Sequence, residues 1–173
     1  MVIGKKMSRN YYLKNLLASL KGSLSGLTTI GAHTYGLKPL LANLNTATGY
    51  SFHKIGKLLN SSYGVIEGWA TRGYGRTTLV AKLIEEVESL IDRIKLRLAI
   101  DNLEPSGNKT NCTAEFISCL QKITGHYQTE LAEVGECSQT LIKRWIELDS
   151  GRTEYLTPIL NFAEPLAYQP VEN

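Results

Sequence analysis

Four polar side chains near residue 140 have the types and the spacing to hydrogen-bond to nucleic-acid bases. Leu141, Ile142 and Trp145 recur at helical spacing, which indicates the buried face of a helix. The opposite face of that helix then carries Gln139, Thr140, Lys143 and Arg144. A glutamine amide can form two hydrogen bonds with adenine, and an arginine guanidinium can do so with guanine. These residues could therefore read base edges in the major groove of duplex DNA.

Other kinds of chemistry find little support in the sequence. There is no P-loop, no G-x-S-x-G and no metal-ligand cluster. The cysteines form neither an even set nor a C-x-x-C pair; they stand at Cys112, Cys119 and Cys137. The histidines occur singly, at His33, His53 and His126. We therefore expect no enzymatic activity, no cofactor, no metal and no small-molecule ligand.

Charge is distributed unevenly along the chain. From Met1 to Lys82 there are eleven Lys and Arg against one acid, Glu67, which gives +10. From Leu83 onward there are eight against fifteen, which gives −7, and the two values sum to the net charge of +3. The basic segment should attract polyanions, because each phosphate that it neutralises releases condensed counterions. The alternative is an accidental run of charge on a solvated face.

The chain contains an internal repeat with a spacing of 76 residues. Residues 40–90 align with 116–166 without a gap, with eleven identities in 51 positions. The identities include Ser62/Ser138, Ile66/Ile142, Trp69/Trp145 and the Gly-Arg-Thr runs at 75–77 and 151–153. Apolar character is kept at many of the other pairs. The repeat predicts two copies of one structural unit.

Each copy is predicted to be a series of short helices, because apolar residues recur every three and four positions and breakers fall between them. The first helix, 38–47 or 114–123, ends at Gly49 or Gly125. The second helix covers 51–58 or 127–134. A polar turn follows, and Ser62 or Ser138 caps a third helix, with a fourth after the Gly-Arg-Thr run. A tight turn between the second and third helices is typical of a helix-turn-helix.

The second copy resembles the Cro/lambda-repressor-like helix-turn-helix family. It reads Gln128-Thr-Glu-Leu131-Ala132 in its second helix and Ser138-Gln139-Thr-Leu-Ile142-Lys-Arg-Trp145 in its third, and the first copy matches at Ile55-Gly56, Ser62 and Ile66-x-x-Trp69. The resemblance implies an all-α fold of two tandem helix-turn-helix domains, with four to five short helices each, joined by a longer helix and a linker. It also implies that Gln128 contacts a phosphate and braces Gln139. Where the family has glycine in the turn, this chain has Asn60 and Glu136.

The two copies differ in the residues that would face DNA. The outward set of the first copy is Tyr63, Gly64, Glu67 and Gly68, which offers few donors to bases. We therefore expect specificity in the second copy and phosphate contacts around the first, from Lys54, Lys57, Arg72 and Arg76. Arg76 and Arg152 begin equivalent helices, where each can reach a phosphate or stay a solvent-exposed turn residue. Ser62 and Ser138 are expected to cap first, with phosphate contact as a second role.

The predicted domains follow from these patterns. Residues 1–37 form a basic N-terminal extension with one amphipathic helix and no counterpart before the second copy. Residues 38–102 form the first helix-turn-helix domain with an extended last helix, 103–111 a linker, 112–166 the second domain and 167–173 a tail. An apolar stripe along 77–102 either bridges the domains or pairs with a second chain, so a homodimer stays open.

The function that these features predict is sequence-specific binding of double-stranded DNA by a prokaryotic, phage or plasmid transcriptional regulator. One alternative is an architectural or accessory factor at a plasmid transfer or replication origin. Another is a protein-interaction module with one degenerate helix-turn-helix, in which the acidic second copy has lost DNA binding and docks a partner or another copy of the chain. No apolar run reaches the roughly 18–20 residues that cross a bilayer. We expect a cytoplasmic, nucleoid-associated protein with double-stranded DNA as its partner and no membrane contact.

Overall fold

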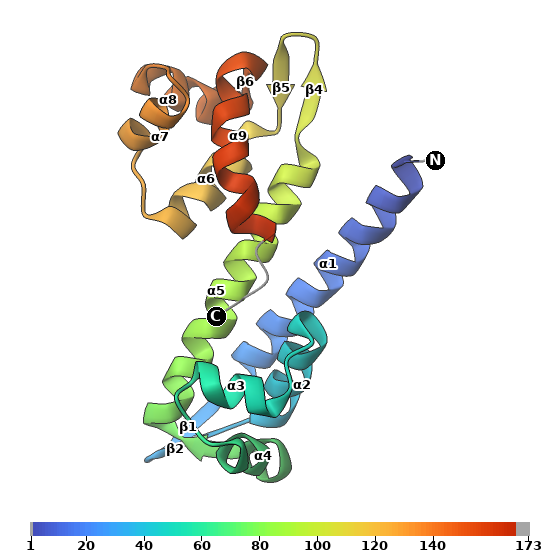
Figure 1. Cartoon of the computed structure of the whole chain (residues 1–173), viewed down its shortest axis with the longest axis vertical. Helices are drawn as coiled ribbons and strands as arrows, with labels where there is room; N and C mark the ends of the chain where they lie inside the picture. Colours follow the sequence, from blue (N-terminus) through green and yellow to red (C-terminus); the bar gives the residue numbers. More distant parts are fainter. Residues whose placement is uncertain (1, 169–173) are drawn as a thin grey trace. The chain divides into compact units, whose positions relative to one another are not determined.

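The computed structural model describes residues 2–168, with side chains from residue 9 onward (Figure 1). These residues are mostly helical, with nine helices and two small sheets. The helical character predicted from the sequence is confirmed at this level. Six strands of three residues each are an addition that the sequence analysis did not predict.

The elements follow one order twice. The first series is α1 (Val2–Ser25), β1 (Thr28–Ile30), β2 (His33–Tyr35), α2 (Leu37–Thr48), α3 (Phe52–Leu58), α4 (Tyr63–Arg72), β3 (Tyr74–Arg76) and α5 (Thr77–Asn102). The second series continues from α5 with β4 (Glu104–Ser106), β5 (Lys109–Asn111), α6 (Thr113–Thr124), α7 (Gln128–Val134), α8 (Gln139–Leu148), β6 (Ser150–Arg152) and α9 (Thr153–Tyr168). Within each series the strands form one antiparallel sheet, in the order β1-β2-β3 or β4-β5-β6.

The repeat begins further upstream than the sequence alignment placed it. Shifted by 76, the bounds of β1, β2 and α2 coincide with those of β4, β5 and α6, and α1 falls on residues 78–101 of α5. The prediction that residues 1–37 have no counterpart is therefore wrong. The predicted linker at 103–111 is instead a β-hairpin, the equivalent of β1 and β2.

Helix α5 closes the first repeat and opens the second. The described residues divide into two compact units, one of residues 11–91 and one of residues 92–168 together with 2–10, so the division falls inside α5 and not at 102. The C-terminal helix α9 corresponds to residues 77–92, the first part of α5. Of the predicted tail, Ala167 and Tyr168 belong to α9, and 169–173 lie outside the described residues.

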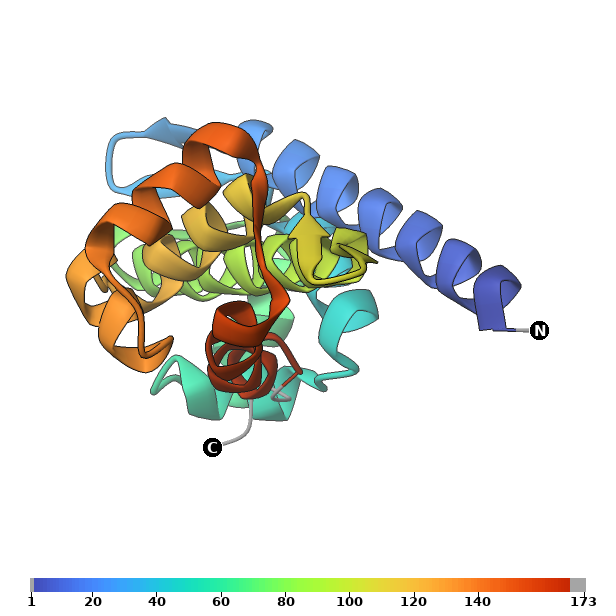
Figure 2. The same cartoon turned by 90° about the horizontal axis from the view of Figure 1, so that it is seen from above.

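The two cores use equivalent positions. In the second unit, α6 to α9 pack around one core, which α5 completes (Figure 2, yellow to red). Buried pairs at the common spacing include Leu40/Phe116, Leu41/Ile117, Leu44/Leu120, Ile55/Leu131, Ile66/Ile142 and Trp69/Trp145. Burying such a side chain stabilises a fold by roughly 1.5–3 kcal/mol, so the repeated apolar positions account for the shared architecture.

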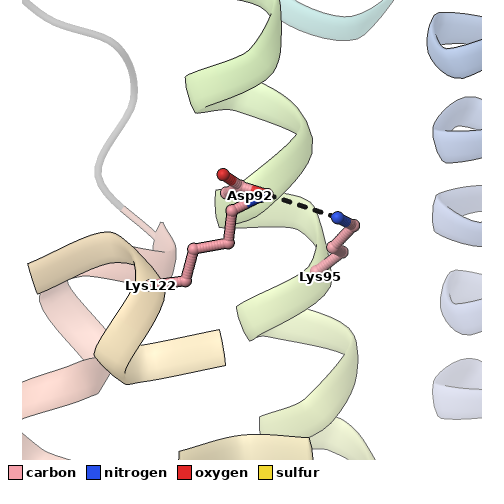
Figure 3. Close-up of polar contacts among 3 residues, drawn as sticks. All are labelled: Asp92, Lys95 and Lys122. Atoms are coloured by element: carbon pink, nitrogen blue, oxygen red, sulfur yellow. Dashed lines mark hydrogen bonds and ion pairs between the residues drawn. The ribbon is translucent and has the colours of Figure 1, made fainter. Parts of the chain in front are cut away.

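An ion pair lies where α5 meets α6 in the second unit, at a position that is apolar in the first repeat. The carboxylate of Asp92 accepts hydrogen bonds from the Nζ atoms of Lys122 at 2.8 Å and Lys95 at 3.3 Å (Figure 3). The residue equivalent to Asp92 in the first repeat is Leu16, which is buried. The end of α5 that serves the second unit is thus held partly by charge. Within residues 2–168, no helix has the length and apolar content needed to cross a membrane.

The turns that end the helices repeat even where the residues differ. Gly49 and Gly125 end α2 and α6 in the left-handed conformation, as predicted. Asn60 and Glu136 adopt φ of 50° and 49° in the turns before α4 and α8. Both turns therefore have a left-handed residue at the same place, although the second carries a glutamate, for which this conformation costs about 1–2 kcal/mol.

Candidate nucleic-acid interface

Helix α8 is fixed by its cap and by its inner face. The Ser138 hydroxyl accepts a hydrogen bond from the backbone N–H of Leu141 at 3.3 Å, and the backbone N–H of Cys137 donates to the carbonyl of Ala132 at 2.9 Å across the turn after α7. Ile142 and Trp145 are fully or nearly fully buried. The buried face and the cap together determine which side of α8 faces solvent.

The polar side chains predicted to face outward from α8 are exposed. They are Gln139, Thr140, Lys143 and Arg144. Leu141 is half-buried between the two faces. Gln128 is the first residue of α7 and is half-buried, and its brace to Gln139 stays a prediction. An exposed helix face with an amide, a hydroxyl and two cations can donate and accept hydrogen bonds in a major groove.

Helix α4 presents a different face at the equivalent place. Its exposed residues include Tyr63, Gly64 and Glu67, and the Tyr63 hydroxyl donates to the Glu67 carboxylate at 2.9 Å. This hydrogen bond and the charge of Glu67 raise the pKa of Tyr63 above its ordinary value. Arg72 lies back along α4, since its Nε donates to the carbonyl of Gly68 at 3.4 Å. The exposed face of α4 therefore carries the Glu67 carboxylate and a glycine without a side chain, where the equivalent face of α8 carries side-chain hydrogen-bond donors.

The other predicted residues of the first copy surround this helix. Lys54 in α3 is half-buried, with its Nζ 4.1 Å from the centre of the Tyr50 ring. Lys57 is exposed in the last turn of α3, and Arg72 and Arg76 are exposed after it. Ser62 occupies the N-cap position of α4, but its hydroxyl, unlike that of Ser138, accepts no hydrogen bond from the first turn. The prediction that the Ser62 side chain caps α4 is therefore wrong.

The repeated Gly-Arg-Thr run packs its sheet against the tryptophan of the preceding helix. Gly151 is buried against Trp145, and a Cβ on Gly151 would lie 2.8 Å from Cδ2 of the ring. A Cβ on Gly75 would lie 2.5 Å from Nε1 of Trp69. The threonine that follows shares a hydrogen bond with a buried threonine of the middle strand, as Thr77 does with Thr34 at 3.2 Å and Thr153 with Thr110 at 3.0 Å. The glycine and the threonine therefore have structural roles, whereas the arginine between them is exposed and has no such role in the fold.

The exposed arginine lines a groove, and the groove occurs twice. In the second unit the groove lies between α8 and strands β5 and β6, and its cations are Lys109, Arg144 and Arg152. In the first unit it lies between α4 and strands β2 and β3, with His33, Arg72 and Arg76. Trp145 or Trp69 contributes to the wall of each groove.

Sequence reasoning missed the residues that the middle strands bring to these grooves. Lys109 belongs to the segment interpreted as a linker, and His33 to the N-terminal extension. A signal was present, because Leu27/Leu103, Gly31/Gly107 and Thr34/Thr110 continue the identities upstream at the same spacing. Thr34 follows His33 in β2, and Thr110 follows Lys109 in β5, so the repeated threonine could have located both groove residues.

The described residues offer little for metal or thiol chemistry. Among them, no three His, Cys, Asp or Glu side chains gather in a group that could hold a metal ion. Burial raises the pKa of the Cys119 and Cys137 thiols, which disfavours the reactive thiolate. Comparisons with protein-family models, with curated proteins and with solved structures find no match.

Proposed function

We propose that this chain is a sequence-specific double-stranded DNA-binding protein, built from two tandem helix-turn-helix units similar to the Cro/lambda-repressor family, and that it regulates transcription. The observation that carries the proposal is the pair of helices on either side of each four-residue turn, α3 and α4 or α7 and α8. In both pairs the second helix buries Ile-x-x-Trp and exposes its opposite face. Such a helix can enter a major groove while its partner crosses the backbone.

The two units take different parts in this proposal. Helix α8 reads bases, because its exposed face carries Gln139 and Arg144, the residue types that pair bidentately with adenine and guanine. The first unit supplies non-specific affinity. Residues 11–91 carry eight Lys and Arg against four acids, a charge of +4, whereas residues 92–168 together with 2–10 carry eleven against eleven, a charge of zero. Phosphate contacts position a protein on DNA without reading its sequence.

Selection of bound sites from random duplexes at a stated salt concentration tests this proposal. The full chain should enrich one motif. Gln139→Ala and Arg144→Ala should each relax the base preference at one position by about 1–3 kcal/mol. Asn161→Ala, an exposed position of α9, is the matched control and should select the original motif. An unchanged motif in both α8 variants would contradict the role given to α8.

The alternatives differ in where and what the chain binds. An accessory factor at an origin would protect origin DNA in a footprint and leave promoter activity unchanged. A protein-interaction role for the first unit, in place of the second, is favoured by one observation, the outward carboxylate of Glu67 on α4, which a phosphate backbone would repel. If the first unit serves only protein contacts, Lys57→Gln and Arg76→Gln together should leave DNA affinity and its salt dependence unchanged.

A further inference from the structure

The groove beside α8 concentrates positive charge in a part of the chain, residues 92–168, whose net charge is negative. Three of the eight Lys and Arg of residues 92–168 line it, and they come from three elements: Lys109 from β5, Arg144 from α8 and Arg152 from β6. None of the residues that line either groove carries a carboxylate. Arg152 does form an ion pair with Glu154 at 3.5 Å, but both side chains are more than 60% exposed, so this pair is weak and readily exchanged.

The internal repeat singles out one of these cations. Of the three groove cations, only Arg152 has a Lys or Arg at the equivalent place of the first copy, which is Arg76. The neighbouring identities are explained by the fold, since the glycine accommodates a tryptophan ring and the threonine bonds the middle strand. Both arginines are exposed and line the groove of their own unit. Their side chains therefore face the groove in both copies without contributing to either core.

We infer that each groove holds backbone phosphates of one DNA strand, beside the major groove that the adjacent helix enters. In the second unit Lys109 and Arg152 are the phosphate ligands, and Arg144 forms the wall shared with the base-reading face. In the first unit His33 and Arg76 take the equivalent places, with Arg72 on the wall. In each unit the three-stranded sheet is thus a second element that contacts DNA, in addition to the exposed helix α8 or α4.

The geometry suits a phosphodiester strand better than a base. Lys109 and Arg152 are paired neighbours on adjacent antiparallel strands, so their side chains leave the sheet at one place. They lie beyond the C-terminal half of α8, whereas Gln139 and Thr140 occupy its first turn. When a helix places its first turn in the major groove of DNA, which is about 12 Å wide, the protein residues beside that helix lie against the phosphate backbone that flanks the major groove. Lysine and arginine are the side chains that most often bind phosphate oxygens.

The test measures how DNA affinity depends on salt, and it rests on the proposed function. Each lost phosphate contact should lower the magnitude of the negative slope of log affinity against log salt by about 0.9. For Lys109→Gln and for Arg152→Gln we expect this change in slope once, and for the double variant about twice. The loss of DNA affinity of each single variant relative to wild type should therefore shrink about threefold between 50 and 200 mM salt. Both positions are exposed, so the variants should melt as wild type does. The motif selected from random duplexes should stay the same.

A matched control separates a groove from a general charge effect. Lys122→Gln removes one positive charge from the same unit, at an exposed position in the last turn of α6 that pairs with Asp92 and does not line the groove. Its melting temperature is measured alongside, and the substitution should leave the slope unchanged. An equal fall in slope for Lys122→Gln would overturn the inference, as would an unchanged slope for the double variant. A wild-type chain that binds no duplex would instead defeat the proposed function itself.

A second arm distinguishes a DNA backbone from a small phosphate ligand. Titration calorimetry of the full chain with inorganic phosphate and with a mononucleotide, without DNA, should give no saturable binding at millimolar concentration. Saturable binding that the double variant loses would assign the groove to a free phosphate compound and overturn the backbone assignment.

Discussion

Replacing Gly151 by alanine should displace the Trp145 ring in the core of the second unit. A Cβ on Gly151 would lie 2.8 Å from Cδ2 and 3.0 Å from Cγ and Cε2 of that ring. Ordinary contact begins near 3.4 Å, so the ring or the strand must move by roughly 0.6 Å. The ring has little freedom, because Trp145 is 3% exposed and its carbonyl accepts a hydrogen bond from the buried Thr113 hydroxyl at 3.0 Å.

The expected cost is that of adding a methyl group to a packed core, about 1–3 kcal/mol. For a unit of this size, each kcal/mol lowers the melting temperature by about 4–8 °C, which predicts a fall of about 4 °C at the lower limit and about 24 °C at the upper. Differential scanning calorimetry of the full chain measures it. Gly75→Ala should act in the same way on the first unit, since its Cβ would come within 2.5 Å of Nε1 of Trp69.

Gly64→Ala is the matched control for this prediction. A Cβ at Gly64 would meet nothing within 4 Å, and Gly64 lies inside α4, so alanine there should stabilise the first unit by roughly 0.5–1 kcal/mol. A melting temperature for Gly151→Ala equal to that of wild type would refute the argument from the tryptophan contact. So would equal losses for Gly151→Ala and Gly64→Ala.

Two further predictions concern the turn before the exposed helix. Ser138→Ala should lower stability by about 1 kcal/mol, because it removes the hydroxyl that caps α8. Ser62→Ala should cost less, since the Ser62 hydroxyl does not cap α4, and equal shifts in their urea midpoints would contradict this difference. Glu136→Gly should raise stability by about 1 kcal/mol, because glycine adopts a φ of 49° without a Cβ clash. Asn60→Gly should gain less in the same urea assay, and a lower midpoint for Glu136→Gly would exclude backbone strain as the dominant effect there.

The helices and the glycines that end α2 and α6 could be predicted from the sequence, because each is specified locally. Gly49 and Gly125 end α2 and α6 as expected, and Ile66 and Ile142 are fully buried at the predicted inner face. The exposed face of α8 follows from the same spacing, since the residues opposite a buried stripe must face solvent. A helix several turns long gives a periodic signal that chance seldom produces.

The hairpins could not be predicted in this way, because each strand is only three residues long. The strands β1 and β4 are exposed along their whole length, so they show no alternation of apolar and polar residues. In β2 and β5 the single inward residue is a threonine, Thr34 or Thr110, which satisfies its hydroxyl with a partner 43 residues away. A long-range pair of this kind leaves no local pattern. For the same reason Lys109 and His33 were not recognised as site residues.

Because α5 both ends the first repeat and begins the second, the two repeats are not separated by a linker. A protein whose domains are joined by a flexible linker can vary the spacing of its two binding sites by lengthening that linker. Here the segment that would have to be lengthened is a helix, and its residues Val80, Leu83 and Val87 are buried in the first unit while Leu96 and Ala99 are buried in the second. One inserted residue would turn the following side chains by about 100° and take them out of register with one of the cores. Nor does any single cut yield two complete repeats, because residues 78–92 correspond both to α9, the end of one repeat, and to α1, the start of the other. Separate versions of the two repeats would have to overlap over those residues.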